Sequence, residues 1–314
     1  DLDYDGMLVG APAINWTKLH IEQLWGGLMQ LEARNPVANC KFQVATQAAV
    51  EACDAIDGVK DGVIDDPSKC AYDPQTLVGQ TTPCGAITQA DADVIRAIWD
   101  GPKRRDGSFI WYGLPRGADF AGLSGSGGTP LEPRPNSITL DWWRFFLNQN
   151  PQWDWKTVTR ASYEQYLDQS LEEFTATLGT DNPDLTGFRD RGGRIVMWHG
   201  QADQLIYAPG SVDYYKRVQQ AMGGAEKTAQ FMRLYLAPGV AHCSGGAGPQ
   251  PTGAFEAMVN WVENGKAPDT IEAVRRDQTG AVTRSRPLCP YPAMAHYKGN
   301  GSTDQAGNFE CRRP

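Results

Sequence analysis

Two short segments carry a carboxylate and an imidazole in an order that suits ester hydrolysis. Residues 199–203 (HGQAD) follow one apolar run, and residues 238–242 (PGVAH) follow the next. In an open α/β sheet, functional side chains gather beyond the carboxyl ends of the strands. In a Ser-His-Asp triad the carboxylate orients the imidazole, which takes the serine proton and returns it to the leaving alcohol. We therefore expect Asp203 to be the acid and His242 the base. The alternative is that Asp203 caps a helix and His242 is an ordinary turn residue.

The sequence offers a second imidazole but no matching nucleophile. His199 also ends a strand-like run, but it lies four residues before the acid and would have to reach back past it, so His242 is favoured as the base. A nucleophile elbow reads G-x-S-x-G between a strand and a helix. The serines near glycines, Ser124, Ser126 and Ser244, do not satisfy that pattern. In folds with this elbow the triad residues follow the chain order Ser, Asp, His, so we expect the serine upstream of Asp1.

A second group of carboxylates lies in a loop between two cysteines, residues 53–70. Asp54, Asp57 and Asp61 alternate with glycines at positions 58 and 62. Carboxylate and carbonyl oxygens are the ligands that Ca²⁺ prefers, and glycine permits the tight bends of such a loop. The spacing differs from that of an EF-hand. The loop predicts a calcium site, and a solvated acidic turn is the alternative.

Periodicity separates an alternating α/β portion from a heterogeneous insertion. Apolar runs predict strands at 7–10, 194–198 and 231–236, and helical spacing predicts helices at 211–222 and 255–262. Strands that alternate with helices indicate a parallel sheet and the α/β class. The stretch between the first two strands holds helix-like segments at 18–32 and 43–52 and a dense aromatic region, without strand–helix alternation. It therefore predicts an inserted domain with its own core. The expected divisions are a core strand (1–14), an inserted lid (15–188), the remaining core (189–270) and a C-terminal tail (271–314).

Composition restricts the partners and the compartment. The net charge is -8 and no Lys/Arg run occurs, which argues against nucleic acid and anionic membranes. No apolar run of 18 residues is present that could span a bilayer. The seven cysteines cannot all pair within the chain, and their polar surroundings favour disulfides and an oxidising compartment. A zinc site is disfavoured because there is no CxxC pair or histidine cluster.

Taken together, these motifs resemble the tannase and feruloyl esterase family, which includes mono(hydroxyethyl) terephthalate hydrolase. The acidic loop and the His242-Cys243 step are the most specific of them. The resemblance extends over nearly the whole chain, at residues 5–16, 53–67, 111–117, 182–185, 192–193, 199–203, 238–246, 286–292 and 308–311.

The resemblance implies an α/β-hydrolase core with a large lid inserted after the first strand, with Asp203 as triad acid and His242 as base. It also implies Ca²⁺ bound by the side chains of Asp54, Asp57 and Asp61 and by the carbonyls of Val59 and Val63. Cys243 would pair with a cysteine beside the catalytic serine, upstream of this chain. The remaining disulfides would be Cys53–Cys70, Cys289–Cys311, which pins the tail, and Cys40–Cys84.

The resemblance further implies a secreted or periplasmic serine esterase of aromatic-acid esters, of the feruloyl, galloyl or terephthaloyl type. The serine would come from an N-terminal portion linked through Cys243, so the chain alone would be inactive. Lid residues would bind the acyl group, with the candidates Trp111, Arg116, Ser124 and Ser126. The rival function is a non-catalytic, secreted binding domain stabilised by calcium and disulfides, which does not require Asp203 to meet His242. A metal-dependent hydrolase is disfavoured because no ligand cluster is apparent.

Overall fold

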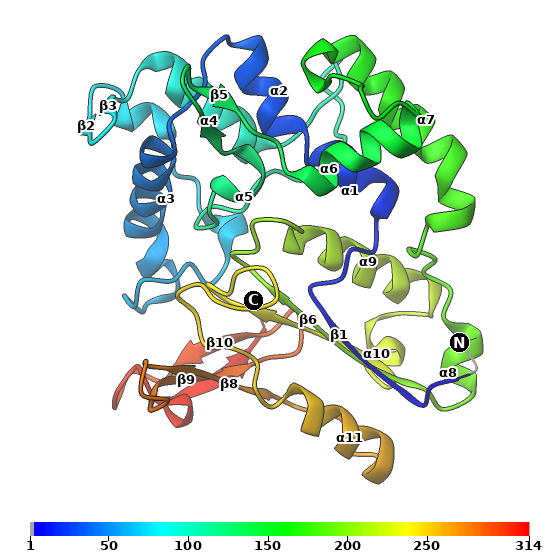
Figure 1. The fold of residues 1–314 in the computed structure, drawn as a ribbon. Helices are drawn as coiled ribbons and strands as arrows, with labels where there is room; N and C mark the ends of the chain where they lie inside the picture. The colour runs from blue at the N-terminus through cyan, green and yellow to red at the C-terminus, as the bar shows by residue number, and fades with distance from the viewer. Residues whose placement is uncertain (1–2, 314) are drawn as a thin grey trace.

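The computed structural model describes residues 3–313 and has two lobes, a helical one above and a lobe built on a sheet below (Figure 1). The lower lobe contains a three-stranded parallel sheet in the order β1 (Gly6–Gly10), β6 (Arg194–Gly200) and β7 (Met232–Ala237). The three predicted strands and their parallel arrangement are confirmed. Since all three strands run in one direction, the segments after β6 and β7 emerge at the same edge of the sheet.

Helices cover both faces of this sheet because the strand residues alternate in direction. Ile195 and Met197 of β6 pack in one apolar cluster with residues of α9 (Ala208–Ala221), whereas Val196 packs in another with α11 (Ala254–Asn264). The short helices α8 (Thr186–Asp190) and α10 (Ala225–Thr228) complete this lobe. The structure confirms the two predicted helices, with ends shifted by one to three residues.

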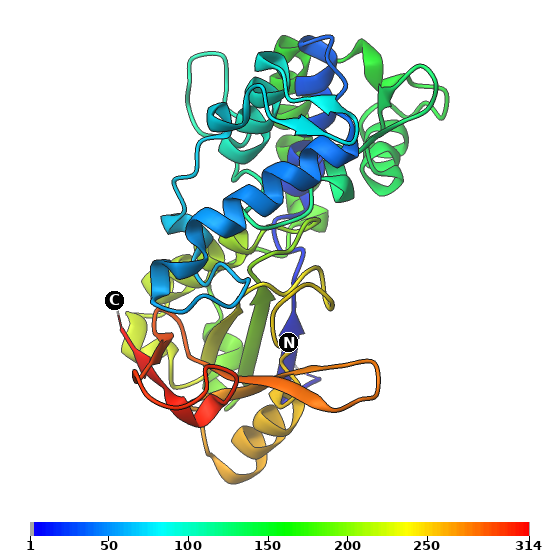
Figure 2. The ribbon, with the colours of Figure 1, turned by 90° about the vertical axis from the view of Figure 1, so that its left-hand side faces the viewer.

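The upper lobe is formed by the chain between β1 and β6 (Figure 2). The predicted helix 18–32 is two helices that break at Gln23 and Leu24, and the predicted helix 43–52 extends at both ends. None of the helices in the described part of the chain has the length and apolar character needed to cross a membrane. The helices are α1 (Trp16–Glu22), α2 (Trp25–Glu32), α3 (Asn39–Cys53), α4 (Gln89–Asp100), α5 (Ala121–Ser124), α6 (Ser137–Asp141), a π-helical segment (Trp142–Leu147) and α7 (Arg160–Leu178).

Aromatic side chains form the core of this lobe. Trp143 and Tyr163 are fully buried, and they pack with Trp25, Trp142 and Trp155 in one cluster. This cluster consists only of residues between β1 and β6, and the predicted bounds of the inserted domain stay a prediction. Short hairpins and 3-10 turns connect its helices: β2 (Thr81–Thr82), β3 (Gly85–Ala86), β4 (Ser126–Gly127), β5 (Glu132–Pro133), Asp54–Asp57, Pro67–Lys69, Pro74–Leu77 and Trp155–Thr157. One further 3-10 turn, Ala306–Asn308, lies in the tail.

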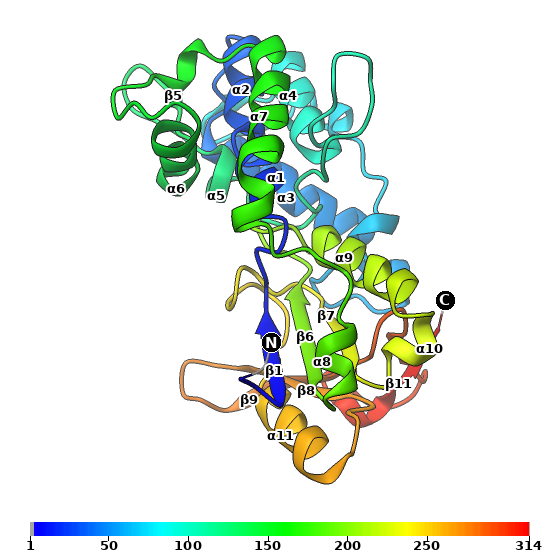
Figure 3. The ribbon, with the colours of Figure 1, turned by 90° about the vertical axis from the view of Figure 1, so that its right-hand side faces the viewer.

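The tail covers one edge of the sheet and leaves the other edge open. It forms two antiparallel hairpins, β8 (Ile271–Arg276) with β9 (Val282–Leu288) and β10 (Met294–Tyr297) with β11 (Phe309–Arg312). Between them, the Tyr291 N–H donates to the Leu234 carbonyl of β7 at 2.7 Å. No strand in residues 3–313 pairs with the outer edge of β1, which lies at the margin of the sheet (Figure 3).

Candidate active site and acidic loop

Asp203 and His242 meet where β6 and β7 end. His242 Nδ1 lies 2.9 Å from Asp203 Oδ2, and the Asp203 side chain is fully buried. The His242 side chain is 27% exposed, so its ring reaches solvent while Nδ1 is held inside. Because an ionised carboxylate only accepts hydrogen bonds, Nδ1 carries the proton and Nε2 is left to accept one. The two residues have the relative geometry of a triad acid and base.

The loop after β6 and a second histidine hold the Asp203 carboxylate. The backbone N–H groups of Leu205 and Ile206 both donate to Oδ1 at 2.9 Å. His199 Nε2 lies 3.2 Å from Oδ2 and 2.7 Å from the Ile206 carbonyl. Burial alone would raise the pKa of Asp203, but its hydrogen bonds with His199, Ile206 and His242, together with the His199 charge, lower that pKa below its ordinary value. Asp203 is thus held in its ionised form.

His199, the competing base in the sequence, has a supporting position instead. Its side chain is completely buried, and its second nitrogen, Nδ1, lies 2.8 Å from the Ser211 hydroxyl. Both oxygens near Nε2 are acceptors, so Nε2 carries a proton, and Nδ1 shares a hydrogen bond with the Ser211 hydroxyl. With both ring nitrogens occupied and no exposed surface, His199 orients Asp203 and cannot reach a substrate.

The lid contacts the same loop, which the sequence analysis did not anticipate. Gln23, at the end of α1, donates from Nε2 to the Leu205 carbonyl at 3.0 Å. Its neighbour Glu22 is buried and hydrogen-bonded to Tyr207; burial raises the pKa of Glu22 well above its ordinary value. The Gln204 side chain accepts the His242 backbone N–H at 3.1 Å. No local motif marks these residues, because each contact joins segments that are distant in sequence.

Cys243 is exposed and is the only one of the cysteines, all of which lie in the described chain, without a disulfide partner. Its backbone has φ +58°, a left-handed conformation that non-glycine residues rarely adopt, and its Sγ lies 3.7 Å from His242 Nε2. Burial, and secondarily the Asp203 charge, raise the pKa of this thiol. No serine hydroxyl among residues 3–313 is hydrogen-bonded to the His242 ring. The geometry therefore contains an acid and a base, with a sulfur beside them.

Three disulfides close loops elsewhere in the chain. All three pairings implied by the resemblance are present, with Cα–Cα distances of 5.5 to 6.2 Å. The pairs are Cys53–Cys70, Cys289–Cys311 and Cys40–Cys84.

The acidic loop folds around the carboxylate of Asp54. This carboxylate accepts the backbone N–H groups of Asp61 and Gly62 at 2.9 Å and of Val63 at 3.3 Å, so the loop wraps around it. Gly58 and Gly62 have φ +89° and +82°, which only glycine adopts without strain. Both Asp54 oxygens are thus occupied by backbone groups.

The other carboxylates of the loop lie close together. Burial, with contributions from neighbouring carboxylates, raises the pKa of Asp57 and raises that of Asp65 well above its ordinary value. Arg286 forms an ion pair with Asp61 at 2.5 Å. Within residues 3–313, no set of three or more His, Cys, Asp or Glu side chains is arranged to hold a metal. Asp65 is a carboxylate of this loop that the sequence analysis did not assign to the site.

The predicted lid contacts with substrate do not gather near His242. The Ser126 hydroxyl donates to the Gln30 side chain at 2.7 Å inside the lid, and Ser124 is buried beside the same helix. Trp111 is 4% exposed in the aromatic core. Lid packing thus occupies the side chains of these three residues, and their contact with substrate stays a prediction. Arg116 is also held within the lid, since its Nε donates to the Tyr72 carbonyl at 3.3 Å, but it lines a cavity of about 330 Å³ together with Gln204 and Ala241 from the loops after β6 and β7.

Comparisons with known proteins identify the family of this chain. The family described as tannase and feruloyl esterase matches residues 2–312. A probable feruloyl esterase of Arthroderma benhamiae is 38% identical over 99% of this chain and 59% of its own length. The mono(2-hydroxyethyl) terephthalate hydrolase of Piscinibacter sakaiensis is 32% identical over 99% of this chain and 60% of its own. The chain thus spans about three fifths of the length of these curated relatives.

Solved structures agree in fold. Feruloyl esterase B from Aspergillus oryzae superposes with a TM-score of 0.86 at 27% identity, covering 99% of this chain and 64% of that one. Tannin acyl hydrolase from Aspergillus niger gives 0.91 at 25% identity, covering 99% and 60%. The fold is therefore of the α/β-hydrolase type with an inserted lid. From its sequence and its fold, the chain belongs to the tannase and feruloyl esterase family.

Proposed function

We propose that this chain supplies the acid and the base of a serine hydrolase that cleaves esters of aromatic carboxylic acids of the feruloyl, galloyl or terephthaloyl type. The supporting observation is the pair itself: a buried, ionised Asp203 holds His242 Nδ1 and leaves Nε2 at the protein surface. The names of the relatives support the ester class, since they are feruloyl esterases and a terephthalate half-ester hydrolase. The nucleophilic serine belongs to polypeptide outside residues 1–314.

Each residue of the pair has a defined part in the reaction. His242 Nε2 takes the serine proton as the hydroxyl oxygen attacks the ester carbonyl, and the imidazolium that forms is stabilised by Asp203. The same nitrogen then delivers the proton to the leaving alcohol, which yields the acyl-serine. Water, activated by His242, releases the aromatic acid. His199 and the N–H groups of Leu205 and Ile206 keep the Asp203 carboxylate in place throughout.

Two features of this chain support an N-terminal portion as the source of the serine. The outer edge of β1 is unpaired in the described residues and Leu8 on it is 39% exposed, which leaves a row of backbone groups for another strand. Cys243 presents a free sulfur beside His242, so a disulfide at this position would bring the partner segment next to the base. In this proposal the chain by itself is inactive.

We also infer that the acidic loop binds Ca²⁺. Asp57 and Asp61 supply carboxylates, and the crowding of these groups with Asp65 supports a cation because it would remove their mutual repulsion. The assigned set further contains Asp54 and the carbonyls of Val59 and Val63. A bound ion would stabilise the loop and take no part in the chemistry of the ester.

The three disulfides support a secreted or periplasmic location, where an oxidising compartment preserves them. In the lid, Arg116 is an assigned substrate residue that lines a cavity with Gln204 and Ala241, from the loops that carry Asp203 and His242. The alternative of a non-catalytic binding domain does not need Asp203 and His242 to meet, and the 2.9 Å contact between them favours the esterase.

The experiment compares His242→Ala with His296→Ala in the full-length protein that contains this chain. His296 is an exposed histidine of β10 and serves as the matched control. Hydrolysis of methyl hydroxycinnamate esters is expected to fall by about 10⁴-fold in the first variant and to stay unchanged in the second. An undiminished rate in His242→Ala would end the proposed role of the pair.

A further inference from the structure

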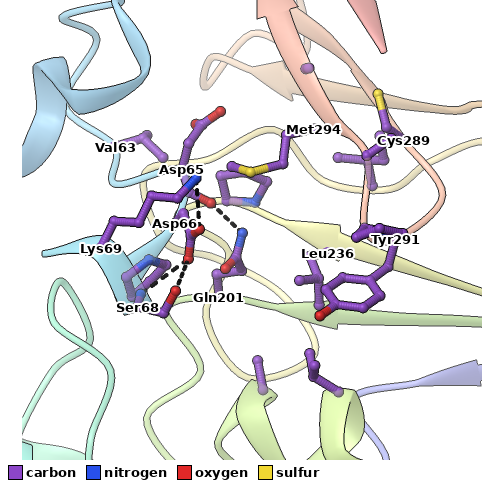
Figure 4. A pocket seen from close by; sticks show the side chains of 18 of the residues that line it. Val63, Asp65, Asp66, Ser68, Lys69, Gln201, Leu236, Cys289, Tyr291 and Met294 are labelled. Atoms are coloured by element: carbon purple, nitrogen blue, oxygen red, sulfur yellow. Dashed lines mark hydrogen bonds and ion pairs between the residues drawn. The ribbon is translucent and has the colours of Figure 1, made fainter. Parts of the chain in front are cut away.

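A cavity of about 370 Å³ lies beside β7, apart from the proposed catalytic pair. Its wall is formed by the acidic loop, the first turns of α9, β7 and tail residues 286–295, which Figure 4 shows facing one another. Neither Asp203 nor His242 lines it. The volume falls within the range of about 300–1,000 Å³ that small-molecule sites occupy. No step of the proposed reaction uses this cavity.

The walls of the cavity are apolar and rigid. Val212 of α9, Leu236 of β7 and Met294 of the tail line it (Figure 4 labels the last two). Proline rings hold their own backbone angles and offer flat apolar surfaces. Such walls fit a planar apolar body, of which an aromatic ring is the simplest kind. The prolines that line the cavity are Pro67, Pro115, Pro209, Pro238, Pro249, Pro287 and Pro292.

One side of the cavity carries donors that have no protein partner. Lys216 Nζ lies 6.0 Å from the centre of the Tyr291 ring, and Tyr112 lines the same cavity. Among residues 3–313, none of these three polar groups has a hydrogen bond or an ion pair. The nearby Asp213 carboxylate is held by Arg217 at 3.0 Å, so it does not neutralise Lys216. An ammonium group and two phenolic hydroxyls form a site for a carboxylate.

The opposite side of the cavity carries acceptors. Gln201 is 8% exposed and its amide N–H donates to the Asp65 carbonyl, which leaves its own side-chain oxygen available as an acceptor. The Asp66 carboxylate accepts from the Ser68 hydroxyl at 2.6 Å, and Lys69 lies 3.3 Å from it. The carboxylates that line the cavity, Asp61, Asp65 and Asp66, would repel an anion but can accept a hydrogen bond from a hydroxyl group. Figure 4 shows Gln201 and Asp66 on the side of the cavity away from Tyr291.

We propose that this cavity binds a hydroxylated aromatic carboxylic acid. The carboxylate of the ligand lies at Lys216 and Tyr291, its ring lies between the apolar walls, and its phenolic hydroxyl donates to Gln201. Such an acid is the acyl product of the proposed ester hydrolysis, so the interpretation of this cavity as a product-binding site rests on the proposed function. The binding of the acid does not rest on the proposed function, because an acid can bind to the cavity without any ester being hydrolysed.

The test is calorimetric titration of the full-length protein that contains this chain with 4-hydroxycinnamate at neutral pH, where the carboxylate is ionised and the phenol is not. One saturable site is expected. Cinnamate lacks the hydroxyl and 4-methylphenol lacks the carboxylate, and each is expected to bind at least about tenfold more weakly, the factor that a single hydrogen bond to a charged or buried group supplies. Absence of saturable heat in the millimolar range would overturn the proposal.

Variants locate the bound acid. Lys216→Gln is expected to weaken binding at least about tenfold, whereas Lys227→Gln, an exposed lysine on α10, leaves it unchanged. Val212→Trp fills the cavity and is expected to abolish binding. Lys216→Gln decides the question even if the larger side chain disturbs folding, because Lys216 is exposed.

The failure of this proposal is distinguishable from failure of the esterase. If 4-hydroxycinnamate binds and His242→Ala removes the binding while Lys216→Gln does not, the acid occupies the catalytic pair and the separate site is wrong. If the full-length protein hydrolyses esters but the Lys216 and Lys227 variants bind the acid equally, the site is wrong and the esterase stands. If the acid binds as expected and the full-length protein does not cleave esters, only the interpretation of the bound acid as a reaction product is wrong.

Discussion

Replacing Asp203 with asparagine separates the catalytic role of this residue from its structural one. An asparagine can keep one oxygen toward the N–H groups of Leu205 and Ile206, as Asp203 Oδ1 does at 2.9 Å. Its NH₂ group then faces His242 Nδ1, where Asp203 Oδ2 accepts at 2.9 Å. Since the amide nitrogen only donates, His242 must accept at Nδ1 and carry its proton on Nε2. In that tautomer His242 cannot take the serine proton.

The expected losses differ greatly in size. The rate kcat should fall by about 10⁴-fold, as it does when the same change inverts the tautomer in other serine hydrolases. The free energy of unfolding should fall by only about 2–4 kcal/mol, because two charge-assisted bonds become neutral ones and the His199 contact is lost. Ester hydrolysis by the full-length protein and urea unfolding measure the two quantities. Asp269→Asn makes the same change at an exposed carboxylate and is the matched control.

One result would refute this reasoning. If the Asp203→Asn protein is folded, with a small loss of stability, and keeps more than a tenth of the wild-type rate, then the tautomer of His242 does not control the reaction. Asp203 would then be a structural acceptor for the loop after β6, and the 2.9 Å contact would have no catalytic meaning.

Three further outcomes are expected. Removing Ca²⁺ with a chelator should lower Tm, and the loss corresponds to about 3 kcal/mol if the ion is present at a hundredfold excess over its Kd. Asp57→Asn should reduce the effect of the chelator on Tm. Equal Tm values with and without chelator would contradict the proposed calcium site. Replacing both Cys289 and Cys311 by serine should lower the free energy of unfolding by about 3 kcal/mol, because the bond closes the tail onto the sheet lobe. Urea unfolding of the wild type and the double variant without reductant measures this loss, and equal midpoints would contradict it. Burial raises the pKa of Glu22, so its contribution to stability is present at low pH and is lost as the pH rises through the raised pKa of the folded state. Glu22→Gln should remove this loss of stability with rising pH. An unaltered dependence of Tm on pH would show that Glu22 is not buried in its neutral form.

The sheet lobe was predictable because its signals are local. Short apolar runs bounded by glycine predicted β6 and β7, and the parallel direction of such strands brings Asp203 and His242 to one edge. The same reasoning left His199 as a rival base, because sequence order does not show that its ring lies buried between Asp203 and Ser211.

The lid was less predictable because its side chains are used in contacts between distant segments. Ser126 lies in a glycine-rich stretch that suggests an open loop, yet its hydroxyl is bonded to Gln30, 96 residues earlier. The break between α1 and α2 at Gln23 has no glycine or proline to mark it, and it is there that Gln23 contacts the Leu205 carbonyl. Tertiary packing decides such positions.

The most direct test of the central claim is labelling of the full-length protein with a fluorophosphonate, which reacts only with an activated serine. The label is expected on a serine outside residues 1–314, with labelling slowed strongly by His242→Ala and unchanged by His296→Ala. A label on a serine within residues 1–314, or equal labelling rates in the two variants, would contradict the assignment of Asp203 and His242 as the acid and base that activate a serine supplied from outside this chain.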